Sequence, residues 1–446
     1  MGALHVDRQT LSDLDIATLE WRGRDLLTFL DRTRSIGGRA RLRSLLCNPL
    51  ETAEEIEERQ KVLREISARI EHFDSRDLGH LLDGVQRYLA SSYMELPRSR
   101  ARCLYVAWRQ PEMMERLLQG LEATARLLII GQQMATILEP ISAERTELDT
   151  IRRALRGCLE KNAFGMLMRV RTNRRRRLNL ARLDHAIRRD GREALTGLVN
   201  AIHEIDALQS LACAAALDGF AYPTVVDSPE PFLVAEAAFH PLVASPCPAD
   251  IDIGLAPRLI FLTGPNMAGK TTYLKTCGVI AVLAHVGMAV PARSATLSTF
   301  EILFSILTTQ DSVSRGESYF LAEVRRVGAL AEHLVAGKRV LALADEMFKG
   351  TNVLDAHDAT ELVVTSIARY GQGAFIVSSH LTELAERFAH SSFVALMQFD
   401  VTMNDGAPSF TFQLTPGVSA KRLGMFLLQR EGVAQSLASI ANSGTC

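Results

Sequence analysis

The spacing of apolar residues divides the chain into two parts. Over residues 1 to about 215, Leu, Arg, Glu and Ala dominate, Gly is rare, and apolar positions recur three and four residues apart. This period predicts amphipathic α-helices. In "PLETAEEIEERQKVLREISARIEHF", for example, Thr52 precedes an acidic first turn, while Ile56, Leu63 and Ile66 mark one face. Residues 144–217 predict two long helices with a break between Asn162 and Asn173.

The pattern changes near residue 220, where prolines and short apolar runs replace the helical period. Beyond this point apolar runs such as "RLIFLTG", "RVLALADE" and "GAFIVSSH" alternate with helical segments. Such alternation predicts a mostly parallel sheet with helices on its faces. We therefore expect an all-helical region over residues 1–220 and an α/β domain over residues 221–446.

Composition limits the class of protein. The 50 basic and 51 acidic side chains give a formal net charge of −1, so any surface for nucleic acid must be local. The seven cysteines include no C-x-x-C pair, which favours reduced thiols over disulfides or a zinc site. No secretory signal is evident, and the most apolar window, near residues 127–138, is too short to span a bilayer. We expect a soluble cytoplasmic protein without a membrane partner.

A glycine loop provides the first candidate chemistry. "GPNMAGKT" fits G-x-x-x-x-G-K-[ST] between an apolar strand and a helix, where backbone amides and the helix N-terminus can surround phosphate oxygens. Lys270 is expected to reach the β- and γ-phosphates and Thr271 to ligate Mg²⁺; a structural glycine turn is the alternative. The residues expected to bind ATP are Gly264, Pro265, Asn266, Met267, Ala268, Gly269, Lys270, Thr271 and Thr272.

Two later strands end in polar residues. "RVLALADE" ends in Asp345, a candidate Mg²⁺ ligand, and Glu346, a candidate base for water. "GAFIVSSH" ends in His380, a candidate γ-phosphate sensor, since the carboxyl ends of adjacent parallel strands meet at one edge of a sheet. The alternatives are a solvated acidic turn and a structural histidine. Lys270, Glu346 and His380 form the predicted catalytic set.

"SRGES" opens a further helix and makes a second possible anion site that includes Ser318. One ATP does not need two helix N-termini from one chain. A homodimer in which each subunit lends its Ser318 loop to the ATP of the other resolves this.

These motifs together resemble one family. "TGPNMAGKTTYLK", "VGMAVPA", "DSVSRGESYFLAEV", "LADEMFKGTNVLDA" and "SSHLTELA", in that order, are similar to the ATPase domain of MutS mismatch-repair proteins. "TLEWRGRDLLTFLDRTRSIGGRARLRSLLCNPL" resembles the start of the MutS core domain, and residues 415–441 resemble its C-terminal dimerising segment. The resemblance implies a helical core and lever region followed by a P-loop ATPase domain of the ABC type.

The resemblance also implies roles for single residues. Asn266 and Lys270 would contact phosphate, Ser318 would act on the partner's ATP, and the loop with Gly350, Thr351 and Asp355 would cross the dimer interface. The sequence departs from the family pattern at Ala268, at Thr271 and at Glu317, which places a negative charge beside the signature serine. We expect the adenine contacts near Phe239, His240 and Pro241.

The family's DNA-binding domains are not expected in this sequence. The likeness begins near the first residue, so we expect neither the mismatch-reading and connector domains nor the inserted clamp. In the clamp's place stands "MRVRTNRRRRLNLARLDHAIRRDGR". Its arginines are candidates for contacts with duplex phosphates, without sequence reading; a solvated helix face is the alternative. The DNA-binding candidates are Arg171, Arg174, Arg175, Arg176 and Arg177.

The expected function is therefore that of a dimeric, ATP- and Mg²⁺-dependent, MutS-like ATPase that binds double-stranded or branched DNA. It would act in DNA repair or recombination, with repair or recombination proteins as further partners. The alternative is an ATP-driven dimeric switch that acts on a protein partner without binding DNA.

Overall fold

The computed structural model forms two compact units. It describes residues 4–17, 25–69, 77–91, 105, 108–139, 147–160, 164–165, 167, 180–254, 257–307, 319–404, 407–419, 428–430 and 432–437. The sheet unit comprises Met1–Leu26, Cys47–Ile56 and Asp218–Cys446. The helical unit comprises Leu27–Leu46 and Glu57–Leu217.

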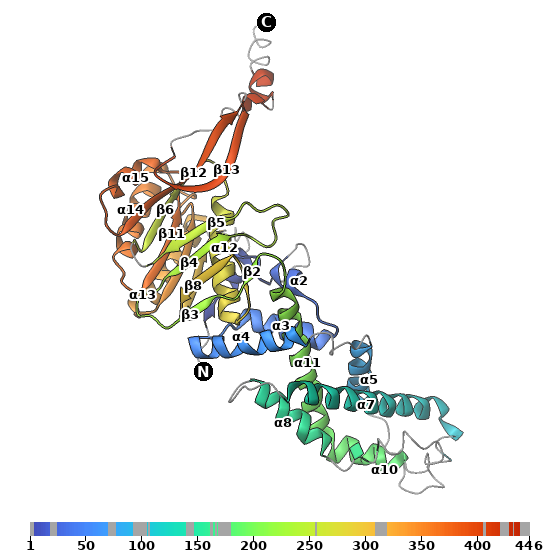
Figure 1. Ribbon diagram of the computed structural model, residues 1–446. Coiled ribbons are helices and arrows are strands. Elements are labelled where there is room, and N and C mark those ends of the chain that lie inside the picture. Colours follow the sequence, from blue (N-terminus) through green and yellow to red (C-terminus); the bar gives the residue numbers. More distant parts are fainter. Residues whose placement is uncertain are drawn as a thin grey trace. The chain divides into compact units, whose positions relative to one another are not determined.

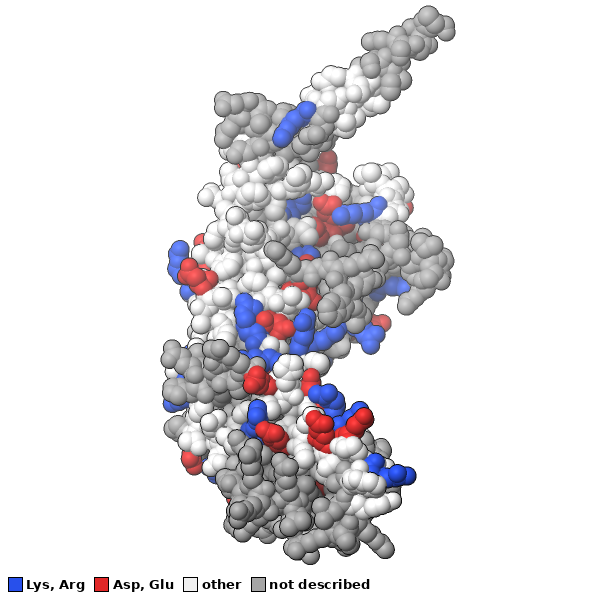
Figure 2. Space-filling view, turned by 90° about the vertical axis from the view of Figure 1, so that its right-hand side faces the viewer, with Lys and Arg blue, Asp and Glu red and all other residues white. Residues whose placement is uncertain are grey.

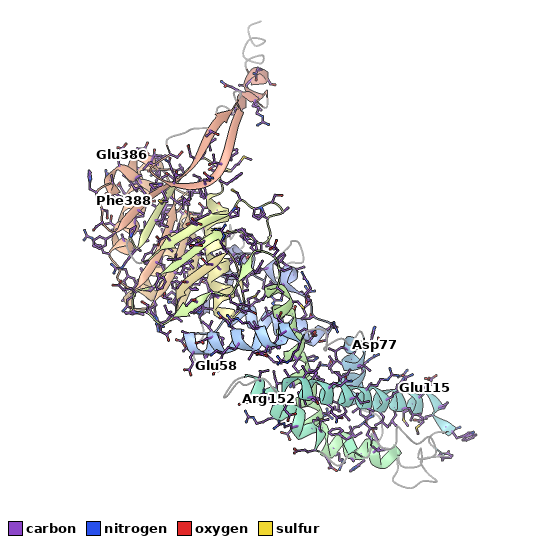
Figure 3. The ribbon with its side chains drawn as sticks, viewed as in Figure 1. Glu58, Asp77, Glu115, Arg152, Glu386 and Phe388 are labelled. Atoms are coloured by element: carbon purple, nitrogen blue, oxygen red, sulfur yellow. The ribbon has the colours of Figure 1, made fainter. Side chains whose placement is uncertain are left out.

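The described elements of the helical unit are all helices, as the apolar period predicts (Figure 1). Helix α5 packs on α7, α7 on α8, and α8 on α11. Arg152 of α8 donates to the carbonyl of Leu138 at 2.6 Å and so caps the end of α7 (Figure 3). Most of the interval in which the break is expected, residues 162–173, lies outside the described residues, so the break stays a prediction. The helices are α2 (Leu26–Leu30), α3 (Ile36–Cys47), α4 (Ala53–Ala68), α5 (Leu78–Ala90), α7 (Pro111–Leu138), α8 (Glu147–Leu159), α10 (Leu180–His185), the π-helix η3 (Ala186–Asp190) and α11 (Arg192–Ala215).

A buried carboxylate on α11 explains the Gly-Gly pair at the start of α3. Asp206 accepts hydrogen bonds from the backbone N–H of Arg34 at 2.9 Å and from the N–H and hydroxyl of Ser35 at 3.0 and 2.6 Å. A Cβ atom at Gly38 would lie only 2.1 Å from the Asp206 carboxylate. Glycine therefore permits the close approach that lets α11 cap α3.

The sheet unit contains the α/β elements. They are β1 (His5–Val6), α1 (Arg8–Asp13), β2 (Phe220–Ala221), β3 (Thr224–Val226), β4 (Leu233–Ala238), β5 (Ala249–Ile253), β6 (Leu259–Thr263), α12 (Lys270–Val286), β7 (Val290–Pro291), β8 (Ser294–Ser298), β9 (Ile302–Ile306), α13 (Tyr319–Val335), β10 (Val340–Asp345), α14 (Val353–Ala368), β11 (Gly373–Ser378), α15 (Thr382–Phe388), β12 (Val394–Asn404) and β13 (Ala407–Pro416).

The main sheet has the order β1-β9-β10-β11-β6-β12-β13. All neighbouring strands pair in parallel except β12 and β13, which are antiparallel. This confirms the predicted α/β class with a mostly parallel sheet. A four-stranded sheet, β3-β8-β4-β5, and the β2-β7 pair complete the unit.

Helices cover both faces of the main sheet. On one face, Phe261 and Phe375 pack with Val364 of α14 and Phe388 of α15 in a buried core that also includes α13 (Figures 1 and 3). Helix α12 contacts β10 and β11, and a Cβ at its Gly278 would meet the Leu343 side chain at 3.0 Å. Strands buried on both faces read as continuous apolar runs, which is why they were visible in the sequence.

The first described residues of the chain belong to the sheet unit. Strand β1 pairs with β9. Arg326 of α13 forms an ion pair with Asp7 and donates to the hydroxyl of Thr10 at 2.9 Å. Ser305 of β9 donates to Asp13 at 2.6 Å. The units therefore divide the chain differently from the expected boundary at residue 220, and the functional domains stay a prediction.

Charge is mixed on the face of the molecule that Figure 2 shows. Acidic and basic side chains are interspersed on the described part of the face in Figure 2, with no wide area of one sign. Within the described residues, no helix has the length and apolar character needed to cross a bilayer.

Candidate nucleotide-binding site

The candidate residues meet where three neighbouring parallel strands end. Strand β11 lies between β6 and β10, and Asp345 is in register with Ser378. The loop after β6, the acidic pair after β10 and the turn after β11 therefore share one edge of the sheet. This is the arrangement expected from the sequence, because strand direction alone places these ends together.

The glycine loop has the backbone that its sequence requires. Gly269 has φ +104° and directly precedes α12, a conformation that side-chain-bearing residues rarely adopt. Met267 also has a positive φ of 70° and is 73% exposed, whereas Ala268 is buried. Asn266, Thr271 and Thr272 are exposed beside it. The loop thus turns sharply into the N-terminus of a 17-residue helix, whose first amides favour an anion.

Lys270 is held inside this loop. Its side chain is 4% exposed, and Nζ donates to the carbonyls of Gly264 at 2.8 Å and Pro265 at 3.3 Å. Nζ also lies 3.6 Å from Glu346. A buried ammonium fixed by backbone carbonyls is placed for a negatively charged ligand at the helix N-terminus.

Thr271 and Asp345 form a pair of oxygen ligands. The Thr271 hydroxyl donates to Asp345 Oδ2 at 2.5 Å, and the Ser378 hydroxyl donates to Asp345 Oδ1 at 2.7 Å. Hydroxyl and carboxylate oxygens are the donors that Mg²⁺ prefers. Ser378 was not expected from the sequence; it orients the carboxylate from the neighbouring strand.

Glu346 is a half-buried carboxylate among cations. It lies 2.8 Å from Lys349 and 3.8 Å from His380. Burial raises its pKa, but the hydrogen bond from Lys349 and the charges of Lys349, Lys270 and His380 outweigh burial and lower the pKa below its usual value. Glu346 is therefore ionised at neutral pH, as a proton acceptor must be. His380 is 63% exposed.

A cavity of about 510 Å³ extends from the loop. We term the part of its lining that belongs to the loop and to the strand ends the phosphate end: Asn266, Met267, Gly269, Lys270, Thr271, Thr272, Asp345, Glu346 and Lys349. The other lining residues include Phe239, His240, Val243, Cys247 and Phe412. The volume suits a nucleotide. Pro241, which the sequence placed beside Phe239 and His240, does not line it.

Two lining residues had no clear sequence signal. Phe412 of β13 is 41% exposed, has φ +52° and would lie 3.3 Å from a Cβ at Gly269. It sits more than 140 residues from the loop, so only the tertiary fold brings it there. Lys349 is the first cation after the acidic pair, but no pattern in the sequence distinguishes it from a surface lysine. It pairs with the candidate base rather than facing solvent alone.

Other predicted residues lie outside the described part of the chain. These are Ser318 of the second anion site and the arginines Arg171, Arg174, Arg175, Arg176 and Arg177. Their placement stays a prediction.

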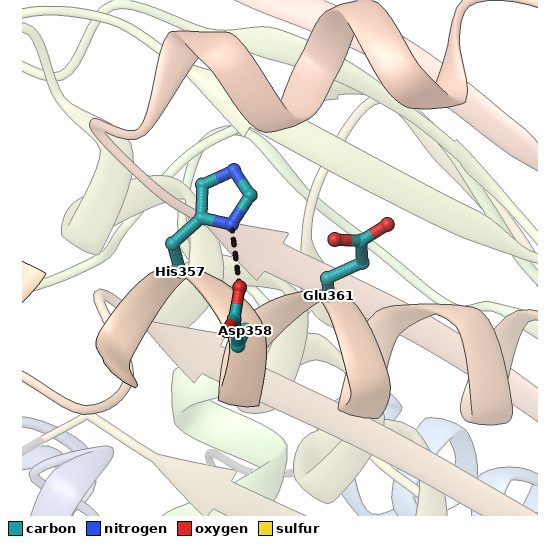
Figure 4. A group of neighbouring side chains, drawn as sticks. All are labelled: His357, Asp358 and Glu361. Atoms are coloured by element: carbon teal, nitrogen blue, oxygen red, sulfur yellow. Dashed lines mark hydrogen bonds and ion pairs between the residues drawn. The ribbon is translucent and has the colours of Figure 1, made fainter. Parts of the chain in front are cut away.

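One further group of side chains resembles a metal site. On α14 the ligand atoms of His357, Asp358 and Glu361 lie within 4.8 Å of one another (Figure 4). Asp358 is 84% exposed, and Glu361 already pairs with Arg387 of α15. We assign no ion to this group, because exposed acids with a cation partner are common on helix surfaces.

Two family models match the chain. Residues 9–212 match MutS domain III and residues 260–444 match MutS domain V. Domain V is the ATPase domain of the family. The range matched to it includes every residue of the phosphate end of the cavity.

Individual relatives agree with these matches. The chain is 29% identical over 248 residues to the DNA mismatch repair protein MutS of Granulibacter bethesdensis, covering 54% of this chain and 26% of that protein. It is 30% identical over 251 residues to MutS of a Synechococcus strain, covering 54% and 28%. The DNA mismatch repair protein MSH7 of Arabidopsis thaliana is 23% identical over 495 aligned positions, covering 99% of this chain and 44% of that protein. The chain thus spans less than half the length of these relatives.

Proposed function

Because the chain belongs to the MutS family, we propose that it is a magnesium-dependent ATPase that works as a homodimer on DNA. One observation carries the ATPase part of this proposal. The buried Lys270, the Thr271–Asp345 pair and the ionised Glu346 converge at one end of a nucleotide-sized cavity.

Each residue has a distinct role in the proposed reaction. Lys270 and the α12 N-terminus hold the phosphates and offset their charge. Thr271 and Asp345 would hold Mg²⁺, which when bound neutralises phosphate oxygens; Ser378 keeps the carboxylate in place. Glu346 accepts the proton of the attacking water. His380, whose Nδ1 lies 3.8 Å from Glu346, would act as the γ-phosphate sensor.

Exposed apolar residues close in sequence to the expected interface segments support the homodimer. Leu321 and Val324 of α13 are each 41% exposed, and Val353 and Leu354 at the start of α14 are 72% and 77% exposed. Large apolar side chains this exposed are covered when a partner subunit packs on them. They flank the segments that the resemblance assigns to the dimer interface.

The DNA part rests on the family and on the arginine run. The relatives are named as DNA mismatch repair proteins. Contacts between arginines and phosphates make affinity independent of sequence and steeply dependent on salt. Repair or recombination partners belong to the same proposal.

ATP turnover tests the enzymatic part. Glu346→Gln is expected to lower kcat by about 10²- to 10⁴-fold while ATP still binds, since only the proton acceptor is removed. Lys270→Ala is expected to weaken ATP binding itself. Glu383→Gln, an exposed acid in the first turn of α15, is the control. Unchanged turnover in the Glu346 variant would contradict the proposed role.

A gel-shift panel of homoduplex, mismatched, branched and single-stranded DNA, with and without ATP, tests the DNA part. Changing the four arginines at 174–177 to serine should abolish binding and the salt dependence. The exposed Arg126 and Arg153 of the helical unit, changed to serine, provide the matched control. A different result is that the unaltered protein binds none of these DNAs and shows the same ATPase rate with and without DNA. That result would favour a switch that acts on a protein partner.

A further inference from the structure

Helix α13 carries a buried carboxylate that is not part of the proposed reaction. Glu323 is 3% exposed. Its Oε2 accepts the backbone N–H of Gly350 at 3.4 Å, and the N–H groups of Lys349 and Phe348 also bond to its carboxylate. Three successive N–H groups directed at one carboxylate form the kind of nest that proteins use to bind anions. Here the anion comes from the protein itself.

The loop that Glu323 holds has a strained backbone. Glu346 has φ +49° and Phe348 has φ +64°. An aromatic residue in the left-handed region is a steric outlier, which persists only where surrounding contacts impose it. The buried Phe348 ring packs against Phe320 of α13, with ring centroids 6.0 Å apart. Helix α13 thus supplies both a hydrogen-bond acceptor and an apolar contact to this loop.

The same loop sets the charges of the nucleotide site. Glu346 and Lys349 line the cavity, and their side chains are 2.8 Å apart. Their separation depends on the turn at residues 346–350, because both side chains project from it. Any change in that turn moves the carboxylate relative to Lys270.

We propose that Glu323 is a positioning residue for Glu346, holding the 348–350 amides so that the Glu346 carboxylate faces the phosphate end of the cavity. A displacement of the first turns of α13 therefore reaches the proposed catalytic carboxylate directly. This inference rests on the proposed ATPase function. Burial raises the pKa of Glu323, while the three amides oppose this change, in keeping with a carboxylate that exists to receive them.

Two variants and a control test this role. Glu323→Ala removes the acceptor, whereas Glu323→Gln keeps the shape and one acceptor oxygen. Glu332→Gln alters an exposed acid on the same helix. We expect kcat of Glu323→Ala to fall by about 10²-fold with a KM for ATP close to the wild-type value, because a misplaced group loses catalysis before binding. Glu323→Gln should fall between, and Glu332→Gln should match the wild type.

Hydrogen exchange supplies a readout that does not depend on activity. Amides of residues 348–350 should exchange about tenfold faster or more in Glu323→Ala, with no change in peptides from α12. A purely structural role predicts a lowered melting temperature with unchanged kcat, and would overturn the inference. Unchanged exchange at 348–350 would overturn it too. If the wild type hydrolyses no ATP, the proposed function fails, while the exchange result still decides whether Glu323 holds the loop.

Discussion

A buried histidine allows a quantitative prediction about pH. His285 of α12 is fully buried; its Nδ1 lies 2.7 Å from the Leu50 carbonyl, and its Nε2 accepts the Phe300 N–H at 3.2 Å. The ring is therefore neutral, with its proton on Nδ1. It fastens the chain at Leu50 to the core of the sheet unit. Burial lowers the pKa of His285 to about 4.

The sign and size of the effect follow from linkage. In the unfolded chain a histidine has a pKa of about 6.5. Between pH 6.5 and 4 the unfolded chain binds a proton at this histidine that the folded protein excludes. The contribution of the neutral His285 to the free energy of unfolding is therefore fully present above pH 6.5 and decreases as the pH falls. On going from pH 7.5 to 5.0, the titration of His285 alone should lower the free energy of unfolding by about 2 kcal/mol. The loss should reach about 3 kcal/mol below pH 4.

Urea unfolding at pH 7.5 and 5.0 measures this contribution. His285→Gln still offers a donor to Leu50 but does not titrate, so it should lose about 2 kcal/mol less than the wild type over this range. His240, whose pKa burial and the charge of Lys275 lower to about 4, is present in both proteins and cancels. Equal losses in the two proteins would refute the assignment of a neutral, buried His285.

Three further predictions concern packing and the nucleotide site. Gly38→Ala should lower the free energy of unfolding by about 2–4 kcal/mol, because its Cβ would overlap Asp206. Gly157→Ala, with open space around it in α8, should raise the free energy of unfolding by about 0.5–1 kcal/mol. Urea unfolding compares the two variants. Phe412→Ala should raise KM for ATP several-fold with kcat retained, as expected for a side chain that lines the cavity but is not in the proposed catalytic set, and a KM equal to that of the wild type would argue against a contact with ATP. Asp345→Asn should raise the Mg²⁺ concentration needed for half-maximal turnover, and chelation should stop turnover in both proteins; a metal titration at fixed ATP decides this.

Local patterns in the sequence were sufficient to predict the parallel strands, the start of α4 and the phosphate end of the site. Apolar runs gave the parallel strands, because strands covered on both faces need apolar side chains throughout. The N-cap pattern placed the start of α4 correctly: Thr52 accepts the Glu55 N–H at 3.3 Å, and the helix begins at Ala53. The glycine loop and the acidic pair were visible because strand direction fixes where they meet.

Contacts between distant residues were not predictable in this way. Asp7 and Arg326 pair across 319 positions, and no local pattern links them. Phe412 reaches the cavity through the β12–β13 hairpin, whose side-chain direction depends on tertiary packing. Lys349 resembled an ordinary surface lysine, because its partner Glu346 is recognisable as such only once the turn is folded.

The place of the N-terminal segment affects how the protein is made. Residues 5–13 leave the ribosome before the helical unit, yet their partners on β9 and α13 are synthesised roughly 300 residues later. The helical unit, inserted between these parts of the sheet unit, is complete in the meantime. During that interval β1 has no strand to pair with, and Asp7 and Asp13 have no partners from β9 or α13. Its production should therefore depend on translation speed and on chaperones more than a chain with contiguous domains would, because closing so long a loop delays the last contacts.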